Sequence, residues 1–195
     1  MVKSCANKIT SLLIAKKTIE YEDYEIYSFG FETLIASIGN IIIILTIGAL
    51  LNRFIETLLF LVFYCSIRQF AGGFHAENYI RCLFCFITMF LTNLYVLDKL
   101  IDSNLTTLII VLASVSYMGI LFLVPQEHRH NPLSSKERKK YKKIVIYLCS
   151  ILIVISAICF NFTITYEYAM YLSSVIVCIF IMLILGLIKK GVTNL

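Results

Sequence analysis

Residues 168–188 read YAMYLSSVIVCIFIMLILGLI, a run of 21 residues that contains no charged side chain. A helix of about 20 apolar residues crosses the hydrocarbon core of a bilayer, which is roughly 30 Å thick. Inside that core every backbone N–H and C=O group needs a partner within the protein, which leaves only helices and closed barrels. Because this run is continuously apolar and does not alternate every second residue, it predicts a transmembrane helix.

Five further apolar runs precede this one, over residues 33–51, 54–67, 79–97, 105–124 and 144–161. The whole sequence is 59% hydrophobic and 15% charged, with a mean hydropathy of +0.87, whereas a soluble domain is about half apolar and a quarter charged. The apolar surplus must face lipid, so we predict a single all-α integral membrane domain, residues 1–195, with about six transmembrane helices. The run 54–67 is the shortest, and we expect it to be tilted, re-entrant or buried against other helices.

The first 28 residues are amphipathic rather than apolar. Ile9, Leu12 and Leu13 alternate with lysines, and acidic residues gather between Glu20 and Glu25. This pattern predicts a helix that lies on the inner membrane surface, and a solvated tail is the alternative. No apolar stretch precedes a small-residue cleavage motif here, so no cleavable signal peptide is expected.

The basic residues predict the orientation of the spans. With six spans and a cytoplasmic N-terminus, all of the 17 Lys and Arg residues except Arg53 and Lys99 fall in or beside cytoplasmic segments. The positive-inside rule strongly favours that orientation, so we expect a multi-pass protein of the cell membrane with both termini in the cytoplasm. The net charge of +5 then reflects topology and contact with the lipid bilayer, and nucleic acid is not an expected partner.

The segment between the second and third apolar runs carries the residue types of a catalytic site. Residues 68–78 read RQFAGGFHAEN, and Cys82 follows His75 by seven positions. An imidazole beside a thiol accepts the thiol proton and later donates it to a leaving group, so a Cys–His pair is a candidate nucleophile and base. We therefore treat residues 68–78 as a candidate catalytic loop on the cytoplasmic side.

The spacing of the pair sets a geometric condition. On one continuous helix His75 and Cys82 would lie about 10 Å apart along the axis, whereas proton transfer needs about 3 Å. The pair works only if His75 lies in a loop that folds back, and Gly72-Gly73 supplies backbone freedom for such a bend. If the next helix starts near Asn78, Cys82 lies in its first turns, where the helix dipole favours a thiolate.

Other uses of these residues stay open. Cys82 and Cys85 have the CxxC spacing of thiol–disulfide oxidoreductases, although the cytosol is reducing and no second cysteine pair is available to relay electrons. A non-catalytic transporter or scaffold is a further alternative, in which polar residues within the runs, such as Asn40, Glu56 and Asn93, would line a path. A zinc site is the third, and its spacings match no zinc pattern, so no metal is expected. Its ligands would come from His75, Cys82, Cys85, His128 and His130.

Residues 125–143 form a second segment of interest and are rich in lysine. We expect a basic cytoplasmic loop here. Its minimum role is to set topology and contact anionic lipids, and its functional role would be to dock an acidic partner. The candidate docking residues are Lys139, Lys140, Lys142 and Lys143.

The pattern RxxAxGxHA over residues 68–76, with Cys82 seven residues beyond the histidine, resembles the signature of the AgrB family of accessory gene regulator membrane proteases. The segment between Pro125 and Pro132, the Lys/Arg run after it, the chain length and the number of spans resemble that family as well. The resemblance implies a membrane cysteine endopeptidase that acts on a small amphipathic precursor peptide with an acidic tail. It would remove the C-terminal tail through a thioester intermediate and promote cyclisation to a quorum-sensing autoinducer.

The resemblance also implies roles for particular residues. Cys82 would be the nucleophile and His75 the base, and Arg68 and Gly73 would support the site. Glu77 is a candidate for orienting His75, as are Asn78 and a backbone carbonyl. A second copy of the chain is a candidate partner, and no cofactor is expected.

Overall fold

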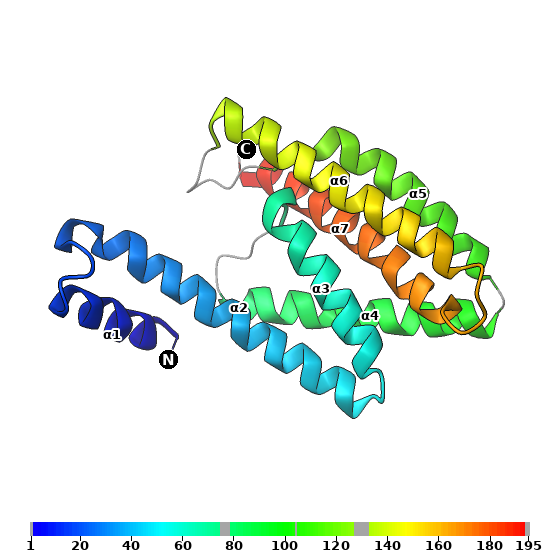
Figure 1. Ribbon diagram of the computed structural model, residues 1–195, viewed down its shortest axis with the longest axis horizontal. Helices are drawn as coiled ribbons and strands as arrows, with labels where there is room; N and C mark the ends of the chain where they lie inside the picture. Colours follow the sequence, from blue (N-terminus) through cyan, green and yellow to red (C-terminus); the bar gives the residue numbers. More distant parts are fainter. Residues whose placement is uncertain (1, 75–78, 104, 127–132, 194–195) are drawn as a thin grey trace. The chain divides into compact units, whose positions relative to one another are not determined.

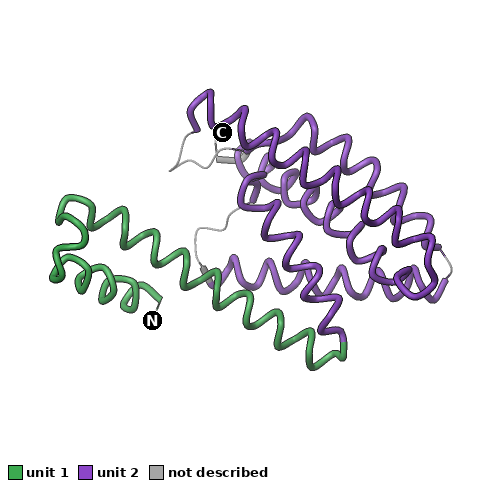
Figure 2. Tube along the Cα trace, viewed as in Figure 1, with its two compact units in different colours: residues 1–52 green, residues 53–195 purple. Residues whose placement is uncertain are grey.

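The computed structural model of the protein describes residues 2–74, 79–103, 105–126 and 133–193. These residues are 87% helical and contain no strand, which confirms the all-α prediction. The chain divides into two compact units, residues 1–52 and 53–195 (Figure 2). The elements are α1 Val2–Ala15, the 3₁₀ turn η1 Tyr21–Asp23, α2 Tyr24–Leu50, α3 Phe54–Ala71, α4 Tyr79–Asp102, α5 Thr106–Leu123, α6 Ser135–Cys159 and α7 Tyr166–Thr193 (Figure 1).

Six of these helices, α2 to α7, are long and apolar enough to cross a membrane, which confirms the predicted number of spans among the described residues. The second of them, α3, is longer than the apolar run 54–67 because the helix continues through the polar residues Arg68 and Gln69 to Ala71. Its 18 residues rise about 27 Å. It is therefore long enough to span, and the short apolar run reflects a polar helix end.

In the first unit α1 packs along α2, with Ala6 and Thr10 of α1 buried. Residues 1–28 are predicted as one amphipathic segment, but α1 ends at Ala15, the chain turns at Lys17 with φ 55°, and α2 already starts at Tyr24. The predicted acidic cluster therefore lies at this turn and in the first turn of α2. The predicted first span thus begins nine residues earlier, because its polar first turns continue the same helix.

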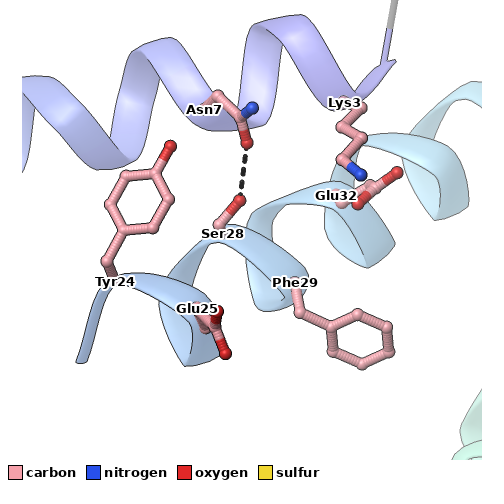
Figure 3. Close-up of a pocket in the computed structure, with 7 residues that line it drawn as sticks. All are labelled: Lys3, Asn7, Tyr24, Glu25, Ser28, Phe29 and Glu32. Carbon is pink, nitrogen blue, oxygen red and sulfur yellow. Dashed lines mark hydrogen bonds between the residues drawn. The ribbon is translucent and has the colours of Figure 1, made fainter. Parts of the chain in front are cut away.

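The face that α1 turns toward α2 is partly polar. The Ser28 hydroxyl donates to the Asn7 side-chain oxygen over 2.7 Å, beside a cavity of about 290 Å³ (Figure 3). Meanwhile Leu12 of α1 is 55% exposed. An exposed apolar side chain suits a helix lying on a membrane surface, and that location stays a prediction. The cavity is lined by Lys3, Asn7, Tyr24, Glu25, Ser28, Phe29 and Glu32.

The second unit is organised around α7, which contacts α3, α4, α5 and α6. Over its most apolar stretch 56% of the residues are buried within the protein, more than in any other span found among the described residues. Ile176, Ile179 and Leu183 are fully buried, and Asn93 of α4 donates to the hydroxyl of Ser174 over 3.0 Å. The most hydrophobic segment of the sequence is therefore the central helix.

The two ends of this unit differ in character. At one end the Arg53 guanidinium pairs with three carboxylates, those of Glu56 at 3.5 Å, Asp98 at 3.2 Å and Glu167 at 3.6 Å. At the other end the Gln126 backbone N–H, just after α5, donates to the carbonyl of Ala71 at the end of α3 over 2.9 Å. The segments that follow α3 and α5 therefore lie at one end, as the alternation of spans requires.

The basic segment is partly helical. Residues 125–143 are predicted as a loop, but α6 begins at Ser135. The reason is a capping box in which the Ser134 hydroxyl accepts from the Glu137 N–H, while the Glu137 carboxylate accepts from the Ser134 N–H. Such a cap supplies partners for N–H groups at the helix start and offsets the unfavourable run of cations. The lysine run therefore forms the first turns of α6.

Candidate functional site

The candidate site residues lie around the junction between α3 and α4. Arg68 is in the last turn of α3, Gly73 follows the helix, and Cys82 is in the first turn of α4. His75 and Glu77 lie outside the described residues. The predicted catalytic loop 68–78 therefore begins at Gly72 rather than at Arg68, because the helix continues to Ala71. The start of α4 at Tyr79 agrees with the prediction that Cys82 lies in the first turns of a helix.

The glycine pair makes the bend that the sequence predicts. Gly72 has φ 72° and ψ −150°, and Gly73 has φ 113°. Residues other than glycine rarely adopt these backbone angles. A Cβ on Gly72 would lie 2.0 Å from the Gln126 carbonyl oxygen, and one on Gly73 would lie 2.9 Å from the Met182 carbonyl oxygen. Both positions therefore require glycine for conformation and for space.

The segment after the bend is anchored on α7. The Phe74 N–H donates to the Met182 carbonyl over 2.9 Å, and the Phe74 carbonyl accepts a hydrogen bond from Arg68 Nη2. The side-chain amide of Gln126 donates to the Leu183 carbonyl over 2.8 Å. The chain is thus held from both sides up to the residue that precedes His75.

Aromatic rings join α3 to α4 one turn inside the ends that carry Arg68 and Cys82. Tyr64 of α3 stacks on Phe86 of α4 with ring centroids 5.2 Å apart. Arg68 lies four residues after Tyr64, and Cys82 lies four residues before Phe86. Phe60 of α3 also packs against Phe90 of α4, with ring centroids 5.5 Å apart. Arg68 and Cys82 each lie one helical turn beyond the Tyr64–Phe86 contact along their own helices.

Cys82 occupies a favourable local environment for a nucleophile. Its side chain is half-buried, and it lies in the first turn of α4, next to the N–H groups of the helix start that have no partner within the helix. These groups and the helix dipole place partial positive charge near the thiol. The start of α4 therefore combines an accessible thiol with positive electrostatics.

One nitrogen of the Arg68 guanidinium makes no hydrogen bond to the described residues. Its Nη1 atom is buried and has no hydrogen-bond partner among the described residues, and it lies 3.2 Å from where a Cβ on Gly73 would be. A buried guanidinium N–H without an acceptor costs free energy. An acceptor on a bound molecule, such as a peptide carbonyl, would satisfy it.

The lysines of α6 stand at the same end as this junction. Tyr141 packs edge-on against Phe70 of α3 with ring centroids 5.4 Å apart, and this contact fixes the start of α6 beside the end of α3. Of the four predicted docking lysines, Lys139, Lys140 and Lys143 are exposed, whereas Lys142 is half-buried. The structure therefore supports three of them as an accessible basic face.

The alternative chemistries receive no support from the described residues. All seven cysteines are free thiols, including Cys82 and Cys85. No group of three His, Cys, Asp or Glu side chains suitable for a metal occurs in the described part of the chain. The histidines of the zinc alternative, His75, His128 and His130, lie outside it.

Two residues of the junction escaped the sequence analysis. Gln126 follows Pro125 at the end of an apolar run, and Gly186 is the one glycine within the apolar run 168–188. Gln126 stands out as a polar residue just after an apolar run, and Gly186 as a glycine among large apolar residues. Their meaning depends on the contact of α7 with residues 72–74, which local sequence does not encode.

Comparison with known proteins gives the family. The family model described as Accessory gene regulator B matches residues 6–188. The chain belongs to the accessory gene regulator B family. This confirms the predicted resemblance to the family, and membership links the chain to accessory gene regulation and quorum sensing.

Relatives in the family are moderately similar in sequence. Accessory gene regulator protein B of Staphylococcus carnosus is 29% identical over 127 residues, 65% of each chain. The protein of that name from Staphylococcus aureus strain MW2 is 26% identical over 151 residues, 77% of this chain and 79% of the relative. A putative AgrB-like protein of Clostridium perfringens is 24% identical over 148 residues, 73% of this chain and 69% of the relative. The chain thus spans just under two thirds of the S. carnosus relative, and no solved structure matches it.

Proposed function

We propose that this member of the family is a membrane cysteine endopeptidase that converts a small precursor peptide into a cyclic autoinducer. Cys82 is the nucleophile and His75 the base. The observation that carries the proposal is the junction itself. A half-buried thiol lies in the first turn of α4, and the chain after Arg68 is anchored up to Phe74, the residue before His75.

The reaction has two acyl transfers. His75 accepts the Cys82 proton, and Sγ attacks a peptide carbonyl of the precursor, so that a C–S bond forms. The C–N bond then breaks, and His75 donates its proton to the departing amine of the tail. An internal thiol or hydroxyl of the precursor next attacks the thioester, giving its proton to His75, while the ring closes and the Cys82 thiol is regenerated.

Arg68 supports this chemistry through both ends of its guanidinium. Its Nη2 donates to the Phe74 carbonyl, and its buried Nη1 supplies a donor for a substrate carbonyl oxygen or for the oxyanion that forms from it. Gly73 provides the backbone conformation that this arrangement needs. Glu77 remains a proposed orienting residue for His75.

Thioester lifetime decides between a linear and a cyclic product. Forming a thioester from an amide is uphill, so release of the tail must draw the first step forward, and water must not intercept the second. The start of α4 offers apolar neighbours to Cys82, notably Leu83 and Phe86, both half-buried. Exclusion of water by such a boundary protects a reactive intermediate.

The basic face of α6 docks the acidic tail of the precursor. Like charges at i,i+3 and i,i+4 spacing on a helix repel each other, and Lys143 has this spacing to both Lys140 and Lys139. Lys139, Lys140 and Lys143 bear this cost on an exposed surface, and an anionic partner would offset it. The proposal includes cytoplasmic termini and a cytoplasmic basic segment, which reporter fusions near Lys140 test. It also includes a homodimer, which cross-linking in membranes tests.

The decisive experiment traps the intermediate. Membranes containing the protein are incubated with a candidate precursor, a short peptide encoded beside its gene, in which the internal nucleophile is replaced by Ala. We expect a covalent adduct on Cys82 that hydroxylamine removes and that is absent from Cys82→Ser and His75→Ala. Cys85→Ala should keep substantial activity as the matched thiol control. Release of linear peptide alone with no trappable adduct would refute the cyclase step, and cleavage by Cys82→Ser would refute the nucleophile.

A further inference from the structure

We infer that α7 supports the catalytic junction, with Gln126 and Gly186 as positioning residues for the base. This inference rests on the proposed function, and neither residue belongs to the pattern that defines the site. Both lie in the second compact unit with α3 and α4. The three segments that they join are residues 72–74, residues 124–126 and the last turns of α7.

Gln126 ties the segments together through its backbone and its side chain. Its N–H donates to the Ala71 carbonyl over 2.9 Å, and its side-chain amide donates to the Leu183 carbonyl over 2.8 Å. The Leu183 carbonyl lies within α7. A carbonyl oxygen in a helix has a second lone pair beyond the one used by the helical hydrogen bond, so it can also accept the bond from Gln126. One residue therefore bridges the end of α3 to α7.

Gly186 makes the close approach feasible. A Cβ at this position would lie 2.8 Å from the Gly73 carbonyl carbon, 2.8 Å from the Phe74 nitrogen and 2.4 Å from Gln126 Oε1. The first two atoms belong to the backbone and cannot rotate away. Any side chain at 186 would therefore push residues 73–74 off α7 and break the bond between the Phe74 N–H and the Met182 carbonyl.

α7 contributes one more contact to the same segment. The Lys189 ammonium lies 5.7 Å from the centroid of the Phe74 ring, within the range of a cation–π interaction. Residue 186 and residue 189 are neighbours on one helix face. A single face of α7 thus holds the backbone and the ring of Phe74.

The anchor acts on the chemistry because it ends one residue before His75. Phe74 and His75 share one peptide bond, so a displacement of Phe74 moves the point from which the chain continues to His75. A misplacement of about 1 Å can reduce turnover by about 100-fold. Precursor capture should be spared, because the start of α6 is held separately by the contact between Tyr141 and Phe70. We therefore expect a loss in kcat with little change in KM.

The chain offers a matched control for each variant. Gly186→Ala is compared with Gly191→Ala, which lies on the same helix and has no atom within 4 Å of an added Cβ. Gln126→Met is compared with Gln69→Met, which removes an exposed side-chain bond of 3.3 Å to the Ser66 carbonyl. If Gly186→Ala does not insert, Gln126→Met still tests the inference, because methionine keeps about the same length and removes the side-chain amide that bonds to Leu183.

Two measurements are made in membrane vesicles. The first is kcat and KM for the precursor. The second is the pH-dependent alkylation rate of Cys82 by iodoacetamide, read by peptide-resolved mass spectrometry, which reports thiolate formation without substrate. We expect Gly186→Ala and Gln126→Met to lower kcat at least 10-fold, to change KM less than 2-fold and to slow alkylation of Cys82 toward the His75→Ala rate. Both controls should match the unmodified protein.

The outcomes separate the inference from the proposed function. If both variants match their controls in kcat and in Cys82 reactivity, α7 does not position the base, while inactive Cys82→Ser and His75→Ala keep the peptidase. A fall in activity with unchanged Cys82 reactivity would also overturn the inference, since it would indicate a packing role alone. If His75→Ala leaves processing and Cys82 reactivity unchanged in the otherwise unmodified protein, the proposed function itself fails.

Discussion

Replacing Gly72 by alanine should abolish most of the processing activity. At φ 72° and ψ −150° the residue lies in a region that is essentially restricted to glycine, where another residue costs about 1–3 kcal/mol. The new Cβ would also lie 2.0 Å from the Gln126 carbonyl oxygen, more than 1 Å inside an ordinary contact of about 3.4 Å. The Cβ is attached to the backbone and the carbonyl oxygen is part of it, so neither can rotate away. The segment around Gly72 and the segment around Gln126 must therefore separate.

The separation removes at least one hydrogen bond. The bond between the Gln126 N–H and the Ala71 carbonyl contributes about 0.5–1.5 kcal/mol. Together with the conformational cost this gives about 2–4 kcal/mol, which corresponds to a roughly 30- to 1,000-fold loss in kcat/KM if all of it displaces the site. Part of the cost will appear as lower stability instead, so the loss expected for the inserted protein lies near the lower figure.

The assay compares Gly72→Ala with Gly39→Ala in vesicles at equal protein level. Gly39 is in α2 and has no atom within 4 Å of an added Cβ, and alanine there should leave activity unchanged and favour the helix by up to about 1 kcal/mol. Precursor cleavage is followed by mass spectrometry of the released tail. Equal rates for the two variants would refute the reasoning that the bend at Gly72 shapes the site.

Three further variants test other parts of the structure. Arg68→Lys keeps the charge but cannot place one nitrogen at the Phe74 carbonyl and a second at the buried Nη1 position, so cleavage should fall about 10-fold or more. The control Arg81→Lys, at an exposed residue, should not change cleavage. Equal rates for the two variants would contradict the role of Arg68. Replacing Lys139, Lys140 and Lys143 by Gln should raise KM for the precursor and make KM less sensitive to salt, with kcat retained. Reporter fusions must first show that this variant inserts normally. An unchanged KM in the inserted protein would exclude docking on this face. Arg53→Gln removes the partner of three carboxylates. It should reduce the free energy of unfolding by about 1–2 kcal/mol for this partly exposed cluster, seen as a lower melting temperature in detergent, while kcat stays near normal because the site is at the other end. Lys99→Gln, whose ion pair is 3.9 Å long and exposed, should change neither quantity, and a large fall in kcat for Arg53→Gln would refute the separation of the two ends.

The fold class could be predicted from sequence because the bilayer makes each span nearly self-sufficient. A run such as 168–188 must satisfy its backbone bonds internally wherever its neighbours lie, so hydropathy alone identifies it as a helix. The same local character allowed the 68–82 segment to be recognised, since residue types and spacing define it. The bend at Gly72-Gly73 was likewise predictable from glycine itself.

Element boundaries were predicted less well where polar residues continue a helix. α3 includes Arg68 and Gln69, and α6 begins with its lysines. Hydropathy measures burial in lipid, whereas helix propensity and capping continue into water. Polar helix ends are therefore invisible to a search for apolar runs.

Only the tertiary structure decided which helix supports the site. The contacts of Gly186 and Gln126 with residues 71–74 and with α7 join parts of the chain that are more than 50 residues apart in sequence. Such contacts depend on how close two helix faces approach, and that distance is set by the side chains on both faces at once. The sequence by itself determined the six helices and the chemical groups, because lipid imposes a helix on each apolar run separately. The packing of the second unit around α7 determined where those groups are held, because it depends on the fit of all its helices together.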